Sequence, residues 1–376
     1  MNIGFGITVL KHGKSKGRLD GIGVYAQAIL NELKKTEHTV YPLKFSSVKD
    51  VIAQKKISYA NLPYSLHSGL SSILHTPIGN FQSYEEKVDF FFAPDHHIPH
   101  FKQIPVIATV MDIIPFVHPE WVSKRLRTFK NFAFKKSILS AEHIITISEY
   151  SKQDIMHQFS ISENHISVVP LGVDKKYFLR IEKDKKQSTL DKYNIHKNFF
   201  LFIGTLQPRK NIIRIIEAYT QLPMEIKEEN VLIIVGQNGW ETDELLEKIE
   251  YLEKSGYGTW LDYVEDTEVL ALFQSATALV YPSLYEGFGL PIIEAFASQC
   301  PVISSNTTSI PEVAGDAALL VDPLSIVEIS NAMQLLAQDI PLRQKLVKKG
   351  ISRVNQFTWE KSIEKHLEVF EKVTQK

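Results

Sequence analysis

The amino-acid sequence predicts an α/β protein made of two doubly wound domains. The chain has 376 residues, more than a single hydrophobic core usually serves, so two domains are expected. Short runs of β-branched and aromatic residues alternate with longer segments of helical periodicity, which is typical of parallel sheets covered by helices. Apolar residues make up 44% of the chain and charged residues 23%, as in ordinary globular proteins.

Each expected strand is a short apolar run followed by turn or helix residues. In the first half the expected strands are 2–10, 39–43, 89–93, 106–110, 143–147 and 166–169. In the second half they are 199–203, 231–235, 260–264, 278–281, 302–304 and 318–321. A polar stretch, 175–192, is predicted to link a first domain of residues 1–174 to a second domain of residues 193–356. The last segment, 357–376, is predicted to be an amphipathic helix with Trp359, Ile363, Leu367 and Phe370 on one face.

Charge and cysteine content restrict the location and the partners. The formal net charge of −1 gives no overall attraction to nucleic acid. The only cysteine, Cys300, excludes an intramolecular disulfide and fits a reducing compartment. No apolar run reaches the ~18–20 residues that span a bilayer, and the N-terminus lacks the pattern of a signal peptide. We therefore expect a cytoplasmic protein, with peripheral contact to the inner face of a membrane left open.

The most informative motif is Tyr281-Pro-Ser-Leu-Tyr-Glu-Gly-Phe-Gly-Leu-Pro-Ile-Ile-Glu294. A strand ends near Tyr281, a glycine-containing loop follows, and Pro291 suits the first turn of a helix. The amides around Phe288, Gly289 and Leu290 are then the unpaired donors of a helix N-terminus, and such an end favours phosphate.

Two glutamates flank this predicted phosphate site. Glu294, one turn into the helix, can accept two hydrogen bonds from a vicinal diol such as that of a ribose. Glu286, before the turn, is placed to reach a sugar beyond the phosphates. The alternative is an ordinary strand–loop–helix connection with a solvated glutamate.

A basic element follows the first strand of the second half. Gly204 ends that strand, and Arg209 and Lys210 stand at the start of the next helix. Two cations at a strand end can neutralise a diphosphate leaving group, arginine as a planar fork and lysine as a point charge. Cations beside the positive end of a helix dipole are otherwise unfavourable, which weakens the alternative of a solvated basic pair.

In this order and separation, the two elements resemble the family 4 retaining glycosyltransferases (glycosyl transferases group 1) of GT-B fold. The paired glutamates Glu286 and Glu294, with seven residues between them, are the most specific match. The resemblance covers most of the chain and includes Gly21-Ile-Gly-Val-Tyr-Ala26, Ile147-Ser-Glu-Tyr-Ser-Lys152, Val168-Val-Pro-Leu-Gly-Val-Asp174 and Ser309-Ile-Pro-Glu-Val-Ala-Gly315.

The resemblance implies two Rossmann-like domains that face a central cleft, with the C-terminal helix crossing back to the N-terminal, acceptor-binding domain. It implies that Glu294 binds the donor ribose, that Glu286 and the loop amides bind the donor sugar and diphosphate, and that Arg209 and Lys210 hold the diphosphate. Gly23 would let the first domain approach the donor phosphate.

One position departs from the family pattern. Relatives often carry histidine at a strand end in a string like Val-His-Asp, where it can bond the primary hydroxyl of the donor hexose. Here the string is Val110-Met111-Asp112, and methionine donates no hydrogen bond. Our hypothesis is that the donor sugar is a 6-deoxyhexose that lacks this hydroxyl. The alternative is a mannose-like donor, with Asp112 or His96 making the contact.

The implied reaction is hexosyl transfer from a nucleoside diphosphate sugar to a glycan or lipid-linked saccharide in surface polysaccharide synthesis, with retention at the anomeric carbon. No cofactor and no metal are expected, since Arg209, Lys210 and the helix amides would stabilise the departing diphosphate. The chain has no Asp-x-Asp triplet to bridge a metal to a diphosphate. The histidines His96, His97 and His100 are interpreted as loop or sugar-contacting residues and not as metal ligands.

Two acceptor-side segments are singled out. The stretch 121–137 interleaves lysines and arginines, among them Lys124 and Arg125, with four aromatic residues, and it would suit either an anionic bilayer surface or a helix with its aromatics packed inside. The stretch 13–23, with Lys14, Lys16 and Arg18, is expected to be an acceptor-side loop that leads into a helix.

Three other functions were weighed. Gly21-x-Gly23-x-x-Ala26 matches a dinucleotide fingerprint, but about ten polar residues separate it from Leu10 and the next strand ends without an acid, which argues against an NAD-dependent oxidoreductase. A nucleotide-sugar epimerase of the same fold would need acid–base groups that the sequence does not place. A catalytically inactive GT-B scaffold subunit is the third, and it is compatible with Met111.

Overall fold

The computed structural model describes residues 1–10, 21–45, 58–60, 81–122, 127–239 and 242–375. The chain forms two compact units. The first contains Met1–Gly172 together with Trp359–Lys376, and the second contains Val173–Thr358.

The first unit is built on a parallel sheet of seven strands in the order β3-β2-β1-β4-β5-β6-β7. The strand order reverses between β1 and β4, and this position is the topological switch point of the sheet. The strands are β1 (Asn2–Gly6), β2 (Thr39–Phe45), β3 (Ser58–Ala60), β4 (Phe90–Ala93), β5 (Val106–Thr109), β6 (His143–Thr146) and β7 (Ile166–Val168).

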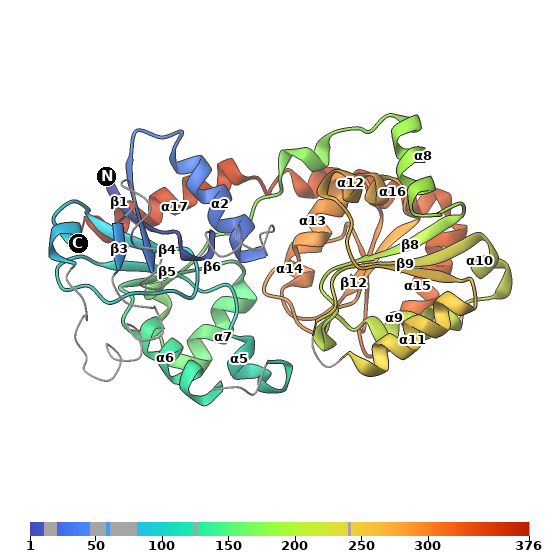
Figure 1. The fold of residues 1–376 in the computed structure, drawn as a ribbon, viewed down its shortest axis with the longest axis horizontal. Helices are drawn as coiled ribbons and strands as arrows, with labels where there is room; N and C mark the ends of the chain where they lie inside the picture. Colours follow the sequence, from blue (N-terminus) through green and yellow to red (C-terminus); the bar gives the residue numbers. More distant parts are fainter. Residues whose placement is uncertain (11–20, 46–57, 61–80, 123–126, 240–241, 376) are drawn as a thin grey trace. The chain divides into compact units, whose positions relative to one another are not determined.

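Successive side chains of β4 point to opposite faces of this sheet, as they do in any β-strand. Phe90 and Phe92 pack against Phe370 of α17 (Trp359–Thr374), which lies beside α2 (Gly21–Leu33). Phe91 belongs instead to the cluster that contains Ile138 of α6 (Arg127–Leu139) and residues of α7 (Glu149–Phe159). Helices therefore cover both faces of the sheet (Figure 1). The short helices α4 (Gln82–Glu85) and α5 (Ile114–Val117) lie in the connections.

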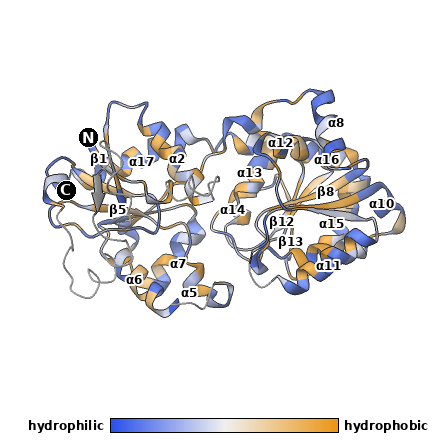
Figure 2. Ribbon diagram, viewed as in Figure 1, coloured by the Kyte–Doolittle hydropathy of each residue, from blue (hydrophilic) through white to orange (hydrophobic). Residues whose placement is uncertain are grey.

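The second unit has a parallel sheet of six strands in the order β10-β9-β8-β11-β12-β13, and its switch point lies between β8 and β11. The strands are β8 (Asn198–Ile203), β9 (Asn230–Val235), β10 (Gly258–Leu261), β11 (Ala278–Tyr281), β12 (Val302–Ser305) and β13 (Leu319–Val321). The central strands are buried along nearly their whole length, and Figure 2 shows them as a hydrophobic band between helices with polar outer faces.

Helices cover both faces of the second sheet as well (Figure 1). Those on one face are α9 (Ile212–Thr220) and α11 (Asp243–Lys254), and those on the other include α12 (Asp266–Ser275), α13 (Leu290–Ala297) and α14 (Ile310–Ala314). The remaining helices are α8 (Lys183–Lys192), α10 (Met224–Glu229), α15 (Ile326–Gln338) and α16 (Ile340–Val354).

The structure confirms the predicted α/β class with two doubly wound parallel sheets, and corrects several boundaries. The strand predicted at 2–10 ends at Gly6, the one predicted at 260–264 is β10 at Gly258–Leu261, and β3 was not predicted. The expected linker at 175–192 is wrong, because this segment folds as a 3-10 turn (Lys175–Phe178) and as α8, which packs on α12. Ion pairs from Lys176 to Asp266 and from Lys192 to Glu268 join it to α12 as part of the second unit.

The C-terminal helix packs in the first unit, as predicted, and a buried hydrogen-bond chain fixes it there. The His366 Nδ1 atom lies 2.7 Å from the Ser362 carbonyl oxygen, so Nδ1 carries the hydrogen. Nε2 therefore accepts from the Tyr25 hydroxyl at 2.7 Å, and the Thr109 hydroxyl, 2.9 Å away, donates to Tyr25. The chain joins α17 to α2 and to the end of β5.

Candidate functional site

The predicted donor-site residues of the second unit lie on two neighbouring loops at its switch point. One loop follows β8 and carries Arg209 and Lys210, and the other follows β11 and carries Glu286. Because parallel strands end at the same edge of a sheet, these loops meet although they are more than 70 residues apart in sequence. This is the place where open α/β sheets bind ligands.

A buried ion-pair network joins the two loops. Nη1 of Arg209 lies 2.9 Å from Oε2 of Glu286, and Nζ of Lys210 lies 2.6 Å from Oε1 of Glu286. Oε1 also accepts from the Tyr281 hydroxyl at 2.9 Å, and that hydroxyl in turn accepts from Nζ of Lys210. Only 8% of the Glu286 side chain and 9% of the Lys210 side chain are exposed. The two predicted cations and one predicted carboxylate thus form one cluster.

The electrostatics of this cluster favour ionised Glu286. Burial alone would raise the pKa of its carboxyl group, but the charges of Arg209 and Lys210 outweigh burial and lower the pKa to about 2. Burial and the Glu286 charge raise the pKa of Tyr281 well above its usual value, so this phenol is neutral. The cluster therefore holds two cations, one anion and a neutral hydroxyl.

Helix α13 begins shortly after Glu286 in the chain, at Leu290. Its N-cap is Gly289, in a left-handed conformation with φ of 103°, and no side chain caps the helix start. A Cβ at Gly289 would lie 2.9 Å from Cδ1 of Ile310, so only glycine fits without displacing that side chain. The Phe288 ring is buried against Phe357, which leaves its backbone as the part that can serve a ligand. Leu290 is the first residue of the helix, as the phosphate-site prediction requires.

Glu294 lies one turn inside α13 and contacts a residue that the sequence analysis did not identify. The Tyr177 hydroxyl lies beside the Glu294 carboxyl group. Glu294 is half-buried, and this burial raises the pKa of its carboxyl group to about 7, since it outweighs the opposing effects of Tyr177 and Lys176, and Asp266 raises the pKa further. The carboxyl group that the sequence predicts to bind a ribose therefore titrates near neutral pH.

The turn after β8 depends on glycines from two loops. Gly204 has a φ of 154°, and its Cα region lies against the Lys210 side chain. A Cβ on Gly236, at the end of β9, would lie 1.9 Å from the Gly204 carbonyl oxygen, and one on Gly239 would lie 2.0 Å from the Leu206 carbonyl oxygen. The segment Gly236-Gln-Asn-Gly239 was missed in the sequence analysis, although two glycines after a strand are the signal of a close backbone approach.

The predicted acceptor-side residues lie in the first unit, near its own switch point. Met111 and Asp112 follow β5, and Asp112 Oδ1 accepts from the Ile114 amide at 3.2 Å. Gly23 is buried in the first turn of α2. His96 follows β4 and is exposed, with its ring 4.2 Å from that of His97.

The same loop contains an Asp–His pair that was not predicted from the sequence. Asp95 is buried, its Oδ2 lies 2.9 Å from Nδ1 of His97, and its Oδ1 accepts from the His97 amide at 2.9 Å. Burial opposes ionisation of Asp95, but the attraction of His97 holds its pKa below the usual value. An imidazole that a carboxylate orients at a switch point is suited to form a hydrogen bond with a hydroxyl group of a ligand.

Comparison with known proteins identifies the family. Residues 19–177 match the family described as Glycosyltransferase Family 4, and residues 181–353 match the family described as Glycosyl transferases group 1. The O-antigen chain mannosyltransferase B of Escherichia coli is 35% identical over 271 residues, which cover 72% of this chain and 71% of that protein. The chain belongs to the group 1 glycosyltransferases.

Two further proteins are similar to this glycosyltransferase. The O-antigen chain mannosyltransferase RfbU of Salmonella typhimurium (strain LT2) is 32% identical over 61% of this chain and 59% of that protein. The crystal structure of Anabaena Alr3699/HepE in complex with UDP and glucose is 17% identical, covers 99% of this chain and 100% of that one, and has a TM-score of 0.74. The predicted fold family is thereby confirmed, and the chain is an enzyme that transfers a glycosyl group.

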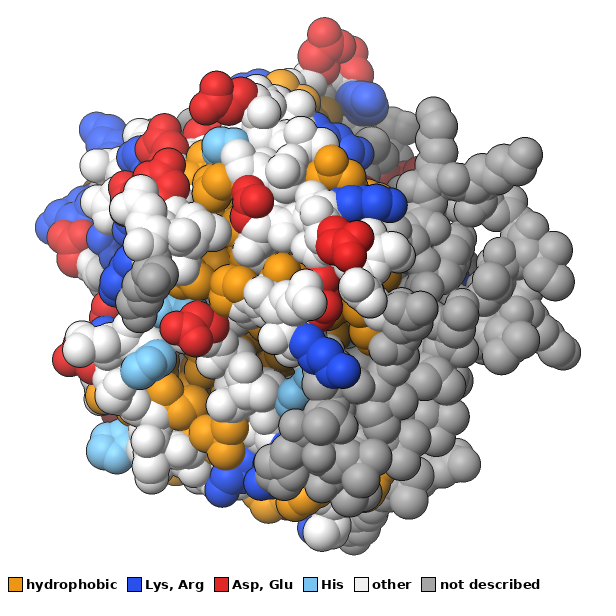
Figure 3. Space-filling view, turned by 90° about the vertical axis from the view of Figure 1, so that its left-hand side faces the viewer, with side chains coloured by type: hydrophobic (Ala, Val, Ile, Leu, Met, Phe, Trp, Pro, Cys, Tyr) orange, Lys and Arg blue, Asp and Glu red, His pale blue; other side chains and the backbone are white. Residues whose placement is uncertain are grey.

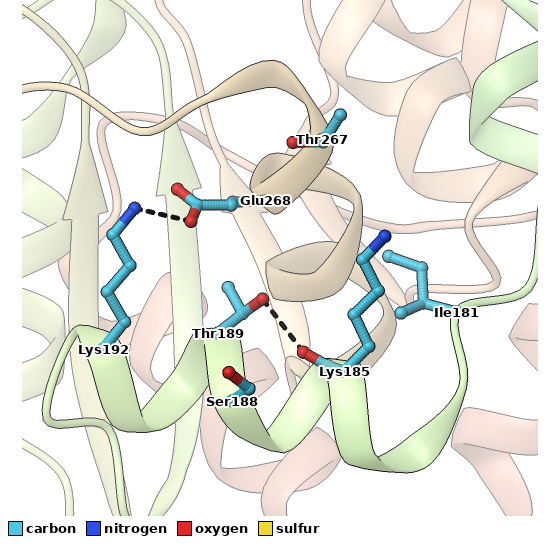
Figure 4. Close-up of a pocket in the computed structure, with 7 residues that line it drawn as sticks. All are labelled: Ile181, Lys185, Ser188, Thr189, Lys192, Thr267 and Glu268. Carbon is cyan, nitrogen blue, oxygen red and sulfur yellow. Dashed lines mark hydrogen bonds and ion pairs between the residues drawn. The ribbon is translucent and has the colours of Figure 1, made fainter.

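A separate cavity of the glycosyltransferase contains none of the predicted site residues. It has a volume of about 250 Å³ and lies between α8 and α12, where Lys192 and Glu268 form an ion pair (Figure 4). Among the described residues no group of three or more His, Cys, Asp or Glu side chains is arranged to hold a metal ion. The cluster around Glu286 therefore remains the candidate site.

The surface of the first unit mixes charges and apolar residues. The described part of the face in Figure 3 carries lysines and arginines interspersed with aspartates and glutamates, so no single charge dominates it. On α6, Phe129 and Phe132 are 47% and 45% exposed, whereas Ala133 and Ile138 are buried. Of the aromatic residues expected in 121–137, these two do not pack inside. Lys124, Arg125 and the 13–20 part of the expected acceptor loop lie outside the described residues.

No helix in the described part of the chain is long and apolar enough to cross a bilayer.

Proposed function

We propose that this glycosyltransferase moves a hexose from a nucleoside diphosphate sugar to a saccharide or lipid-linked saccharide during synthesis of a surface polysaccharide. The observation that carries the proposal is the joint placement of Arg209, Lys210 and the α13 N-terminus at one switch point. Two cations and a set of bare amides are what a diphosphate requires. The related O-antigen mannosyltransferases support the polysaccharide context.

The proposed reaction retains the anomeric configuration. The bond from the anomeric carbon to the diphosphate oxygen breaks, and the acceptor oxygen bonds to that carbon from the same face. The departing diphosphate oxygen takes the acceptor proton, so no protein nucleophile is needed. Negative charge develops on the diphosphate, and Arg209, Lys210 and the amides near Gly289 stabilise it. With two cations present, we propose that no metal takes part.

We propose that Glu294 binds the ribose of the donor and that Glu286 binds its sugar. A ribose diol can donate two hydrogen bonds to one carboxylate, and each bond to a charged group contributes about 1.5–3 kcal/mol. The proposed sugar is mannose-like, as the related mannosyltransferases suggest, or a 6-deoxyhexose. Met111 favours the second, because its side chain donates no hydrogen bond to a primary hydroxyl.

The acceptor is proposed to lie against the first unit, where Asp95 orients His97 after β4, and Met111 and Asp112 follow the neighbouring strand β5. A lipid-linked acceptor would be reached at the inner surface of the membrane. We propose that α6 docks there, because its exposed face combines Phe129, Phe132 and lysines: Nζ of Lys136 lies 6.0 Å from the Phe132 ring centroid. Aromatic side chains suit the headgroup boundary and lysines suit anionic lipids.

Donor binding tests the proposal most directly. Thermal unfolding is measured with UDP-, GDP- and dTDP-sugars, and a donor at 100 times its dissociation constant adds about 2.7 kcal/mol of stability. Transfer to a lipid-linked saccharide is then followed by NMR of the product to determine the anomeric configuration. If none of these sugars binds, the donor-site assignment is wrong. An inverted product would contradict the proposed retention alone.

A further inference from the structure

The carboxylate of Glu286 occupies the same two cations that the donor diphosphate is proposed to use. Its Oε2 atom is bonded to Arg209 and its Oε1 atom to Lys210, at 2.9 Å and 2.6 Å. The inference that follows rests on the proposed function. A carboxylate and a diphosphate that share two buried cations repel each other and compete for the same donor hydrogens.

We propose that Glu286 is an internal counter-ion, which neutralises Arg209 and Lys210 in the donor-free enzyme and is displaced when the donor diphosphate binds. The released side chain then turns to the donor sugar. Glu286 thus first binds the two cations that later bind the phosphates, and then binds the hexose.

The backbone around Glu286 is held on both sides, so the exchange is a rotation of the side chain. The Glu286 amide donates to Oγ1 of Thr308 at 3.3 Å, and its carbonyl accepts from the Ser309 hydroxyl at 2.8 Å. Thr308 and Ser309 lie between β12 and α14, and β12 flanks β11 on the side opposite to β8, the strand that the two cations follow. The carboxyl group can therefore leave the cations while the loop stays in place.

Each cation also has a neutral partner that remains when the carboxylate leaves. Nη1 of Arg209 donates to the Tyr285 carbonyl oxygen at 3.1 Å, and Nε donates to the Gln207 side chain at 3.2 Å. Nζ of Lys210 donates to the Tyr281 hydroxyl and lies 4.7 Å from the centroid of that ring. These contacts keep both cations in position during the exchange.

Tyr281 is in this scheme a positioning residue that acts through Lys210. It is fully buried, and its ring stacks on Phe202 with the centroids 5.9 Å apart. Its hydroxyl hydrogen points to Glu286, and after the proposed exchange it is left to donate to a phosphate oxygen.

The test measures binding of GDP, UDP and dTDP by calorimetry to the full-length enzyme and to Glu286→Gln. Glutamine keeps the shape of the side chain and removes its charge. We expect the variant to bind the preferred nucleoside diphosphate at least about fivefold more tightly, whereas the matching nucleoside without phosphates shows no gain. At saturating donor, turnover should fall because the sugar loses its carboxylate ligand. Equal or weaker diphosphate binding by the folded variant would overturn the inference.

Two further variants keep the test decisive. Glu286→Asp retains the charge but is one methylene too short to hold both cations, so its affinity for the nucleoside diphosphate should rise, though less than that of Glu286→Gln. This variant tests the inference even if Glu286→Gln does not fold. Glu268→Gln changes a carboxylate that pairs with Lys192 outside the site and should leave diphosphate affinity unchanged. If the wild-type enzyme binds none of the three diphosphates, the donor-site proposal fails. If it binds one but both Glu286 variants gain nothing, only the counter-ion inference fails.

Discussion

The hydroxyl group of Tyr177 lies beside the carboxyl group of Glu294, one turn inside α13, and lowers the pKa of that carboxyl group against the effect of burial. This carboxyl group is the one that the donor ribose is proposed to use. Glu294 is half-buried, which raises the pKa of its carboxyl group to about 7. Protonation of Glu294 and donor binding are therefore expected to be coupled.

Donor affinity should fall as the pH decreases through 7. The ionised carboxyl group accepts both diol hydrogens, whereas the protonated form accepts fewer. With a pKa of about 7, the ionised fraction drops roughly tenfold between pH 8 and pH 6, and the affinity should follow. The measurement is the dissociation constant of the donor across this range.

Glu294→Gln is the control for this coupling. It should bind the donor weakly with a flat pH profile between 6 and 8. A variant that keeps the wild-type pH dependence would show that another group is responsible.

Lys210→Ala should lose most transfer activity while the chain stays folded. The substitution removes one of the two cations that stabilise the departing diphosphate. Deleting a preorganised charge-stabilising donor lowers turnover by about 10²–10³-fold. Because Glu286 keeps its bond to Arg209, unfolding should occur at a somewhat lower temperature but remain cooperative. Lys192→Ala, which breaks an ion pair on α8, is the matched control and should transfer normally. Near-wild-type turnover of Lys210→Ala would refute the site.

Met111→His should change the choice of donor sugar. Histidine at this position can bond a primary hydroxyl, so the variant should gain kcat/KM with GDP-mannose relative to a 6-deoxy donor. The experiment compares both donors with wild type and variant. A wild-type enzyme that clearly prefers GDP-mannose or UDP-glucose would reject the 6-deoxyhexose hypothesis.

Removal of the exposed aromatic residues of α6 should weaken membrane binding. Phe129→Ala/Phe132→Ala is compared with wild type by flotation with anionic vesicles at ~0.01 M and ~1 M salt, where the Debye length falls from about 30 Å to about 3 Å. Wild type should float at low salt and less at high salt. Tyr251→Ala removes an exposed aromatic residue of α11 in the second unit and should behave like wild type. Absence of salt-sensitive flotation by wild type would exclude docking on anionic lipid.

Acid should destabilise the first unit through His366. Burial lowers the pKa of His366 to about 4, so the folded chain resists a proton that the unfolded chain binds near pH 6.5. The stabilisation is complete above pH 6.5 and is lost as the pH falls toward 4, by up to about 3 kcal/mol. Denaturant unfolding at several pH values should show that the free energy of unfolding depends less on pH in His366→Phe than in wild type. Identical pH dependence would contradict this assignment.

Local sequence was enough to predict the elements but not the contacts between them. Pro291 and Gly289 mark the start of α13 by their backbone geometry alone, and the helix begins where they place it. The partnership of Lys210 with Glu286 was not predictable, because it depends on which strands are neighbours in the sheet. Both residues are predicted from the sequence to bind the same donor, but their contact with each other is not.

Two other errors have the same physical origin. The polar composition of 175–192 suggested a linker, yet salt bridges and packing on α12 fold this segment as a helix, and packing overrides composition. The apolar face predicted for the C-terminal helix omitted His366, because an imidazole is counted as polar until its partners are known. Tyr25, which bonds His366, and Thr109, which bonds Tyr25, lie more than 250 residues earlier.

The hydrogen bond between Tyr25 and His366 also bears on the order in which the two units can fold during translation. The first unit needs Trp359–Lys376, which are translated after the whole second unit, since its buried Tyr25 hydroxyl donates to a side chain in that stretch. At the usual rate of about 5–20 residues per second, residues 1–172 therefore wait roughly ten seconds or more for this helix. During translation the second unit can form its own core first, so the unit whose strands are made earlier is completed later.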